Sequence, residues 1–141
     1  MEKHEYLTEH FTLWEMMRSG TAVTLNIKNI PGPEEICALR ALCENILEPL
    51  RRRHGAITIT SGYRCVKLNR VIGGAKTSQH LRGEAADIFV PSMETGKKYF
   101  EFIRYRTPFD QLIWEPRGAL VPRWLHVSFT LRRKNRGEIL V

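Results

Sequence analysis

The sequence predicts an α+β domain in which helices cover a small, mainly antiparallel sheet. The best helical pattern lies in the first half of the chain and most strand patterns lie in the second. Regular strand–helix alternation, which is typical of a parallel sheet, does not occur. The 141 residues, 43% of them hydrophobic, suffice for one buried core, so we expect a single domain over residues 1–141.

The helices are predicted from their caps and from apolar periodicity. Thr12 and Glu15 have the spacing of a capping box, which begins a short helix that ends near Ser19. Pro33 begins a longer helix that ends at Gly55, because proline favours the first helical turn and glycine the position after the last. The apolar stripe of this helix consists of Ile36, Leu39, Leu42, Ile46 and Leu50. Two further helices are expected over residues 65–71 and 93–105.

Runs of β-branched and apolar residues between turn residues predict the strands. These strands are expected over residues 56–60, 85–90, 111–114 and 124–130. No apolar run is long enough to span a membrane, so we expect no membrane insertion. The three cysteines lack a CxxC spacing, which predicts neither a disulfide framework nor a cysteine zinc site.

The chain carries a surplus of positive charge, with 22 Lys and Arg against 15 Asp and Glu. A net charge of +7 favours an anionic partner such as nucleic acid, a membrane surface or a cell-wall polymer. No nucleic-acid-binding motif occurs, so we do not expect that partner. Arg132, Arg133, Lys134 and Arg136 form a basic cluster after the last strand, which is either a solvated tail or an adhesive surface for anionic wall polymer.

Polar residues on apolar strands indicate a metal site. Asp87 lies among Ala, Ile, Phe and Val, and His126 alternates with apolar residues in the final strand. A buried carboxylate needs a compensating charge, and a divalent cation would supply it. His80 lies on a loop before a glycine turn that can bring its imidazole over Asp87. Two imidazoles and a carboxylate form a common catalytic zinc shell, although a hydrogen-bonded core histidine and an arginine-paired aspartate explain the same pattern equally well. His4, His10 and His54 are expected at the surface.

The chain contains the motif Ser78-x-His80-x-x-Gly83-x-Ala85-x-Asp87, followed by Trp124-x-His126. This motif resembles the zinc D-alanyl-D-alanine carboxypeptidase family. That family includes phage endolysins that cut peptidoglycan stem peptides, and it shares its fold with the zinc domain of hedgehog proteins. The upstream segment Ser61-Gly-Tyr-Arg64 with Asn69 and the stretch from Phe11 to Met17 are also similar to family members.

The resemblance implies roles for individual residues. His80, Asp87 and His126 are expected to hold one Zn²⁺ per chain, and Ser78 is expected to orient the site by hydrogen bonding. Arg64 is expected to steady the substrate or the developing oxyanion, although a surface or carboxylate-paired arginine is the alternative. Trp114 and Trp124 flank the site in sequence, and either can line the substrate groove or pack in the core.

The general base does not follow the common family pattern. Many relatives have an acid three positions before the last histidine, where this chain has Arg123. We expect Glu115, at the end of the preceding strand, to serve instead as the proton carrier of peptide hydrolysis. Asp110 and Glu84 are the weaker alternatives.

The expected function is therefore zinc-dependent hydrolysis of a peptide bond in peptidoglycan stem peptides. A D-Ala–D-Ala carboxypeptidase, an L-Ala–D-Glu endopeptidase and a prophage endolysin are all compatible with the motif. The alternative is an inactive zinc domain that binds cell wall or a partner protein. We expect a monomer, without an N-terminal signal segment, that acts at the wall after release by phage lysis or another non-classical route.

Overall fold

The computed structural model describes residues 5–141, which form two sheets and several helices. The strands are β1 (Tyr6–Thr8), β2 (Phe11–Thr12), β3 (Ile59–Ser61), β4 (Ala85–Phe89), β5 (Gln111–Glu115), β6 (Trp124–Ser128) and β7 (Glu138–Leu140). The helices are α1 (Leu13–Met17), α2 (Gly20–Thr24), α3 (Pro33–Leu42), the π-helical η1 (Cys43–Leu47), α4 (Glu48–His54), α5 (Val66–Val71), the 3₁₀ helix η2 (Gln79–Arg82) and α6 (Met93–Arg106).

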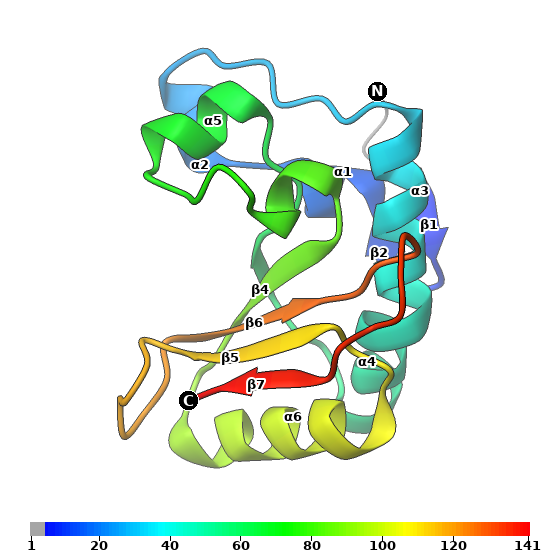
Figure 1. Ribbon diagram of the computed structural model, residues 1–141, viewed down its shortest axis with the longest axis vertical. Helices are drawn as coiled ribbons and strands as arrows, with labels where there is room; N and C mark the ends of the chain where they lie inside the picture. Colours follow the sequence, from blue (N-terminus) through cyan, green and yellow to red (C-terminus); the bar gives the residue numbers. More distant parts are fainter. Residues whose placement is uncertain (1–4) are drawn as a thin grey trace.

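The larger sheet has the strand order β3-β4-β6-β5-β7, while β1 and β2 form a separate antiparallel pair. Only the β5–β7 pair of the larger sheet is parallel within residues 5–141. In Figure 1, α6 crosses the bottom of the sheet, α3 to α4 stand at its right side, and α2 and α5 form the top. The predicted α+β fold with a mainly antiparallel sheet is confirmed. No helix within residues 5–141 has the length and apolar character needed to cross a membrane.

Side-chain alternation divides the sheet into two faces. One face packs against the helices and forms the hydrophobic core, with Ala86, Ile88, Leu112, Leu125 and Val127 buried beside residues of α3, η1, α4 and α6. The opposite face carries the polar residues of β4, β5 and β6. Because one face is fully apolar, the register of each strand is fixed, and the polar residues must all project to the other side.

Most local predictions are confirmed. Thr12 caps α1 by accepting a hydrogen bond from the Glu15 backbone, and Gly55 ends α4 with a positive φ of 82°. The expected strand over residues 56–60 instead pairs from Ile59 to Ser61, although the Phe89 N–H still donates to the Thr58 carbonyl. The strand thus begins three residues later than predicted, at the residues that pair with β4.

The predicted continuous helix from Pro33 to Gly55 contains an unpredicted π-helical segment. Pro49 lies in the first turn of α4 and has no N–H to donate to the carbonyl four residues earlier. The wider η1 turn immediately precedes it and accommodates the proline ring without ending the helix. The sequence analysis also missed α2, η2, β1, β2 and β7.

Candidate metal centre and its pocket

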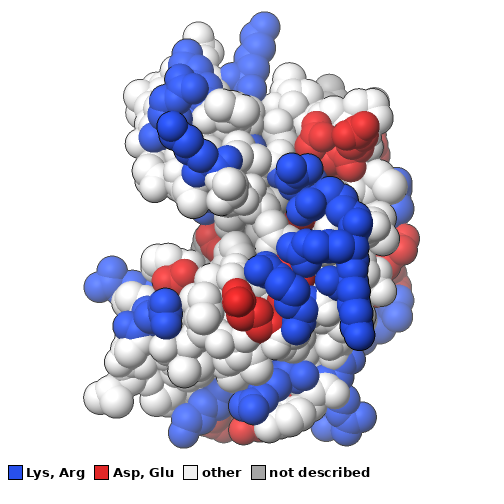
Figure 2. Space-filling model, viewed as in Figure 1, with Lys and Arg blue, Asp and Glu red and all other residues white. Residues whose placement is uncertain are grey.

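The candidate site is a pocket of about 520 Å³ on the polar face of the larger sheet. From the strands, its walls receive the side chains of Asp87, Gln111, Ile113, Glu115, Trp124 and His126. Arg64 and the loop before η2 form one side, and arginines that follow β6 form another. Figure 2 shows the surface hollowed between the part that carries α5 and the part that carries the sheet, with Lys and Arg side chains gathered beside the hollow.

Three sequence-predicted residues meet at the base of this pocket. Asp87 of β4 pairs in register with His126 of β6, so their side chains lie next to each other on one face. His80 comes from η2, which ends at Gly83 with a φ of 73°. That left-handed turn, which favours glycine, reverses the chain into β4. Nε2 of His80 and Nδ1 of His126 lie 3.3 Å and 3.1 Å from the same Asp87 oxygen, Oδ1.

The hydrogen-bond partners of His80 suit a metal-binding imidazole. Its Nδ1 lies 2.7 Å from the Gly62 carbonyl oxygen, which can only accept, so Nδ1 must carry the hydrogen. Burial lowers the pKa of His80, against the opposing effect of Asp87, and so favours the neutral ring. The other ring nitrogen, Nε2, lies 3.3 Å from Oδ1 of Asp87, and either a proton or a metal ion between these two atoms makes the contact favourable. A metal-binding histidine typically donates its other N–H to a backbone carbonyl in this way.

Asp87 is an ionised carboxylate with a second partner. Burial raises the pKa of Asp87, but its contacts with His126 and His80 outweigh burial and hold the pKa well below its usual range. Nη2 of Arg64 donates to the other oxygen, Oδ2, at 3.2 Å. The candidate ligand atoms of His80, Asp87 and His126 all lie within 4.8 Å of one another. This spacing suits a single metal ion bound by nitrogen and oxygen ligands.

Arg64 is held in place by three side chains. Its Nε donates to Ser61 at 3.0 Å, its Nη1 to Asn69 at 3.3 Å and its Nη2 to Asp87. The segment that resembled the family thus acts as one unit in which Ser61 and Asn69 position the guanidinium. Arg64 pairs with a carboxylate, which was the alternative considered for it, and it also lines the pocket.

Ser78, Glu115 and Trp124 also lie at the pocket. The Ser78 hydroxyl accepts the His80 backbone N–H at 3.2 Å and so caps η2. Glu115 lies opposite Trp124 in the β5–β6 register, and Ile113 lies opposite His126. Glu115 therefore shares the pocket face with the candidate metal ligands His80, Asp87 and His126, which are called the metal cluster below. Trp124 lines the pocket. Trp114 points to the other side of the sheet, where it packs edge-on against Phe100 of α6.

Comparison with known families assigns the chain. The family model described as peptidase M15 matches residues 9–128, which include the whole metal cluster and Glu115. The chain belongs to the peptidase M15 family. No curated protein matches the chain. The matched range contains every site residue predicted from the sequence, while the segment after residue 128 lies outside the match.

The two alternative acids of this M15 chain are both paired with arginine. Glu84 is buried and accepts Nε and Nη2 of Arg132, each at 2.9 Å. The fully buried Asp110 accepts hydrogen bonds from Arg133 and Arg136, the shortest at 2.7 Å. In both acids burial raises the pKa, but the arginine hydrogen bonds outweigh it and lower the pKa below its usual range. Both carboxylates are thus engaged in ion pairs, which argues against either of them as the proton acceptor.

Of the two alternatives for the basic cluster, a purely solvated tail does not describe three of its four residues in the M15 chain, and adhesion to wall polymer stays a prediction. These three residues form ion pairs with Glu84 or Asp110, and they line the pocket. Sequence reasoning missed this role because the partners lie far away along the chain. A signal existed, since Glu84 and Asp110 immediately precede strands β4 and β5 and need cations if they are buried. The Gly62 carbonyl was also missed, because a backbone acceptor has no signature in the sequence.

Two further histidines of the described part of the M15 chain, His10 and His54, have partners outside the pocket. His10 donates its backbone N–H to the buried Glu48, and its Nδ1 lies 2.7 Å from the same carboxylate. The half-buried His54 packs edge-on against Tyr99 and Phe102 of α6. The sequence analysis expected His10 simply at the surface, whereas the structure shows it bonded to Glu48. His4 lies outside the described residues.

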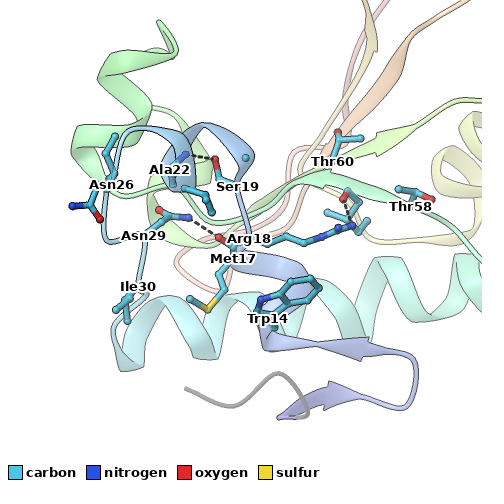
Figure 3. A pocket seen from close by; sticks show the side chains of 14 residues that line it. Trp14, Met17, Arg18, Ser19, Ala22, Asn26, Asn29, Ile30, Thr58 and Thr60 are labelled. Carbon is cyan, nitrogen blue, oxygen red and sulfur yellow. Dashed lines mark hydrogen bonds between the residues drawn. The ribbon is translucent and has the colours of Figure 1, made fainter.

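A larger pocket of the M15 chain, of about 830 Å³, lies between α1, α2 and β3. Figure 3 shows its polar side chains. Ser19 accepts the Ala22 N–H, Asn29 donates to the Met17 carbonyl, and Arg18 donates to the Ile59 carbonyl. These groups bond the chain's own backbone instead of converging on a ligand. We therefore place the chemistry in the smaller pocket.

Proposed function

We propose that this M15 domain is a zinc-dependent hydrolase that cleaves a peptide bond of peptidoglycan stem peptides. The proposal rests on one observation above all: Nδ1 of His80 contacts the Gly62 carbonyl while its Nε2 faces the Asp87 carboxylate. A histidine whose Nδ1 hydrogen is bonded to a carbonyl is ready to bind a metal ion. His80, Asp87 and His126 would hold Zn²⁺, which would polarise the scissile carbonyl and favour ionisation of the attacking water.

Residues of the chain supply the other steps. Glu115 removes the proton from the attacking water and donates it to the leaving amine nitrogen. Arg64 stabilises negative charge on the carbonyl oxygen with the guanidinium N–H groups that its three side-chain partners leave unused. Ser78 holds η2, and thus His80, in position, and Trp124 supplies an apolar wall for the substrate. Family membership and the shared pocket support these roles.

Elemental analysis tests the metal. We expect about one zinc per chain in purified protein, and its loss in a His80→Ala/His126→Ala variant. His54→Ala is the matched control, because this imidazole packs on α6 and is not among the metal cluster residues. Zinc that is absent from the wild-type protein, or that persists in the double variant, contradicts the proposed site.

Digestion of purified muropeptides tests the reaction. The wild-type protein should release products whose masses identify the cleaved bond, D-Ala–D-Ala or an internal bond such as L-Ala–D-Glu. A chelator should stop the reaction and added zinc should restore it. The same digestion of intact sacculi tests action at the cell wall after release, which we propose as the site of action.

A zinc-containing binding domain is the second candidate function. It is favoured by Arg123, an exposed residue in the place where many relatives have an acid. This candidate predicts zinc in the pocket without cleavage of any muropeptide, together with retention on insoluble peptidoglycan. Cleavage by wild-type protein excludes it.

A further inference from the structure

The segment that joins β6 to β7 lies beyond the family match and completes the pocket. The match ends at residue 128, and the next strand, β7, begins at Glu138. Between them, Arg132, Arg133 and Arg136 all line the same pocket as the metal cluster and Glu115. Figures 1 and 2 together show the Lys and Arg side chains gathered along this red segment, beside the hollow.

Two buried carboxylates fix the positions of these arginines. Arg132 binds Glu84 through two parallel hydrogen bonds, and Arg136 binds Asp110 in the same bidentate manner, with Nε and Nη2 at 3.1 Å and 2.9 Å. Arg133 donates hydrogen bonds from both terminal nitrogens, Nη1 and Nη2, to the Asp110 carboxylate. The Arg136 backbone N–H also donates to Asp110, so this one carboxylate binds both the backbone and the side chains of the loop. Paired guanidinium groups of this kind are positioned before any ligand arrives.

These ion pairs leave some N–H donors of the three arginines unused. Each guanidinium has five N–H donors, of which Arg132 and Arg136 each use two in their bidentate pairs. Within residues 5–141, Nη1 of Arg132 and Nε of Arg133 make no hydrogen bond. The three side chains are 39–45% exposed, so their outer edges face the pocket and solvent. Counting Arg64, four arginines line the pocket against two carboxylates, Asp87 and Glu115, because Glu84 and Asp110 are not among the lining residues.

We infer that this arginine cluster, Arg132, Arg133 and Arg136, is a subsite for a free carboxylate of the substrate, next to the scissile bond. The inference rests on the proposed function and names the substrate class, a stem peptide with an unamidated carboxylate. The cluster presents planar forks that match a carboxylate and have no acceptor for an amide N–H. Amidation removes the charge and turns one acceptor into a donor, so an amidated peptide meets unpaired N–H groups at this edge of the pocket.

Cleavage of matched peptides tests the inference. Zinc-loaded protein is given one stem peptide in three forms: with all carboxylates free, with the D-glutamate α-carboxylate amidated, and with the C-terminal carboxylate amidated. We expect one of the two amidations to lower kcat/KM at least 10-fold. Arg132→Gln or Arg136→Gln should slow cleavage of the free form and leave the disfavoured amidated form nearly unchanged, so that the preference disappears.

Controls separate recognition from folding. Arg132→Lys and Arg136→Lys keep the charge without the fork and should retain part of the preference, and Arg106→Gln, an exposed change at the end of α6, should retain all of it. Zinc content and circular dichroism of each variant report whether the site is intact. Equal rates for the three peptides, or an unchanged preference in both Gln variants, overturn the inference.

Binding provides the same comparison without catalysis. Titration calorimetry of the zinc-loaded Glu115→Gln variant with the three peptides should give a dissociation constant at least 10-fold weaker for the disfavoured amide. Zinc-bound protein that cleaves nothing but shows this difference refutes the hydrolase and keeps the subsite. Protein that cleaves all three peptides alike refutes the subsite and keeps the hydrolase.

Discussion

The buried Asp110 holds Arg133 and Arg136 of the arginine cluster by ion pairs. Its replacement by asparagine measures how much these ion pairs contribute to the free energy of unfolding. The carboxylate is fully buried and accepts six hydrogen bonds, from Gln79, Arg133 and Arg136. Asp110→Asn keeps the shape but removes the charge, and it places an NH₂ group against donors. Breaking a buried ion pair by removing one partner typically costs about 3–5 kcal/mol. Arg133 and Arg136 are 39% and 45% exposed, so water can solvate them, and we expect a loss of about 3 kcal/mol.

The pH dependence of this loss identifies its origin. Burial raises the pKa of Asp110, but the arginine hydrogen bonds outweigh it and hold the pKa well below the unfolded value of about 3.9. A depressed carboxyl pKa stabilises the fold above the unfolded pKa, and this stabilisation is lost as the pH falls toward the folded pKa. The difference between wild type and Asp110→Asn should therefore be constant from about pH 7 to 5 and shrink by about 1 kcal/mol between about pH 5 and 3.

Urea denaturation followed by circular dichroism measures both quantities. Glu101→Gln, at an exposed position of α6, is the control and should change the free energy of unfolding by less than about 0.5 kcal/mol at every pH. A loss below about 1 kcal/mol at neutral pH refutes the proposed anchoring. A full-sized loss that does not shrink on acidification shows instead that packing, rather than charge, holds the segment.

Three further changes have defined outcomes. Glu115→Gln should lower kcat on stem peptides at least about 100-fold with zinc content unchanged by elemental analysis, and an unaltered rate removes this residue from the mechanism. Gly62→Ala places a Cβ 2.2 Å from the Met16 carbonyl oxygen and should lower the free energy of unfolding in urea by more than about 2 kcal/mol. Gly20→Ala, whose Cβ meets nothing within 4 Å, should not lower it. Leu42→Ala empties a fully buried position and should cost about 3 kcal/mol in the same assay, so a loss under about 1 kcal/mol contradicts the core assignment.

Local chemistry explains which parts of the fold were predictable. Pro33, Thr12 and Gly55 fix helix ends through their own backbone preferences, so the sequence was sufficient there. Strand β7 was missed because Glu138–Leu140 is extended only through parallel pairing with β5, a contact made between segments more than twenty residues apart. The π-helical segment was missed because a proline inside a helical pattern predicts a break as readily as a widened turn.

The candidate site divides in the same way. Asp87 and His126 were predictable because a polar residue on an apolar strand needs an explanation. The groups that support these residues could not be predicted. They are the backbone carbonyl of Gly62 and the ion pairs that join Glu84 and Asp110 to a loop distant in sequence. Such contacts depend on the tertiary fold, and no spacing within one segment encodes them.

Gly62 has a consequence for mutational libraries of this domain. On one side its backbone lies against Met16, and the next residue, Tyr63, donates its N–H to the Met16 carbonyl at 2.7 Å. On the other side its own carbonyl accepts from His80. A substitution that shifts α1 is therefore transmitted through two peptide units to the imidazole of His80, one of the three candidate metal ligands. Selection of a randomised α1 for stability alone should thus enrich variants that also differ in zinc affinity, although no residue of α1 lines the pocket of the metal cluster.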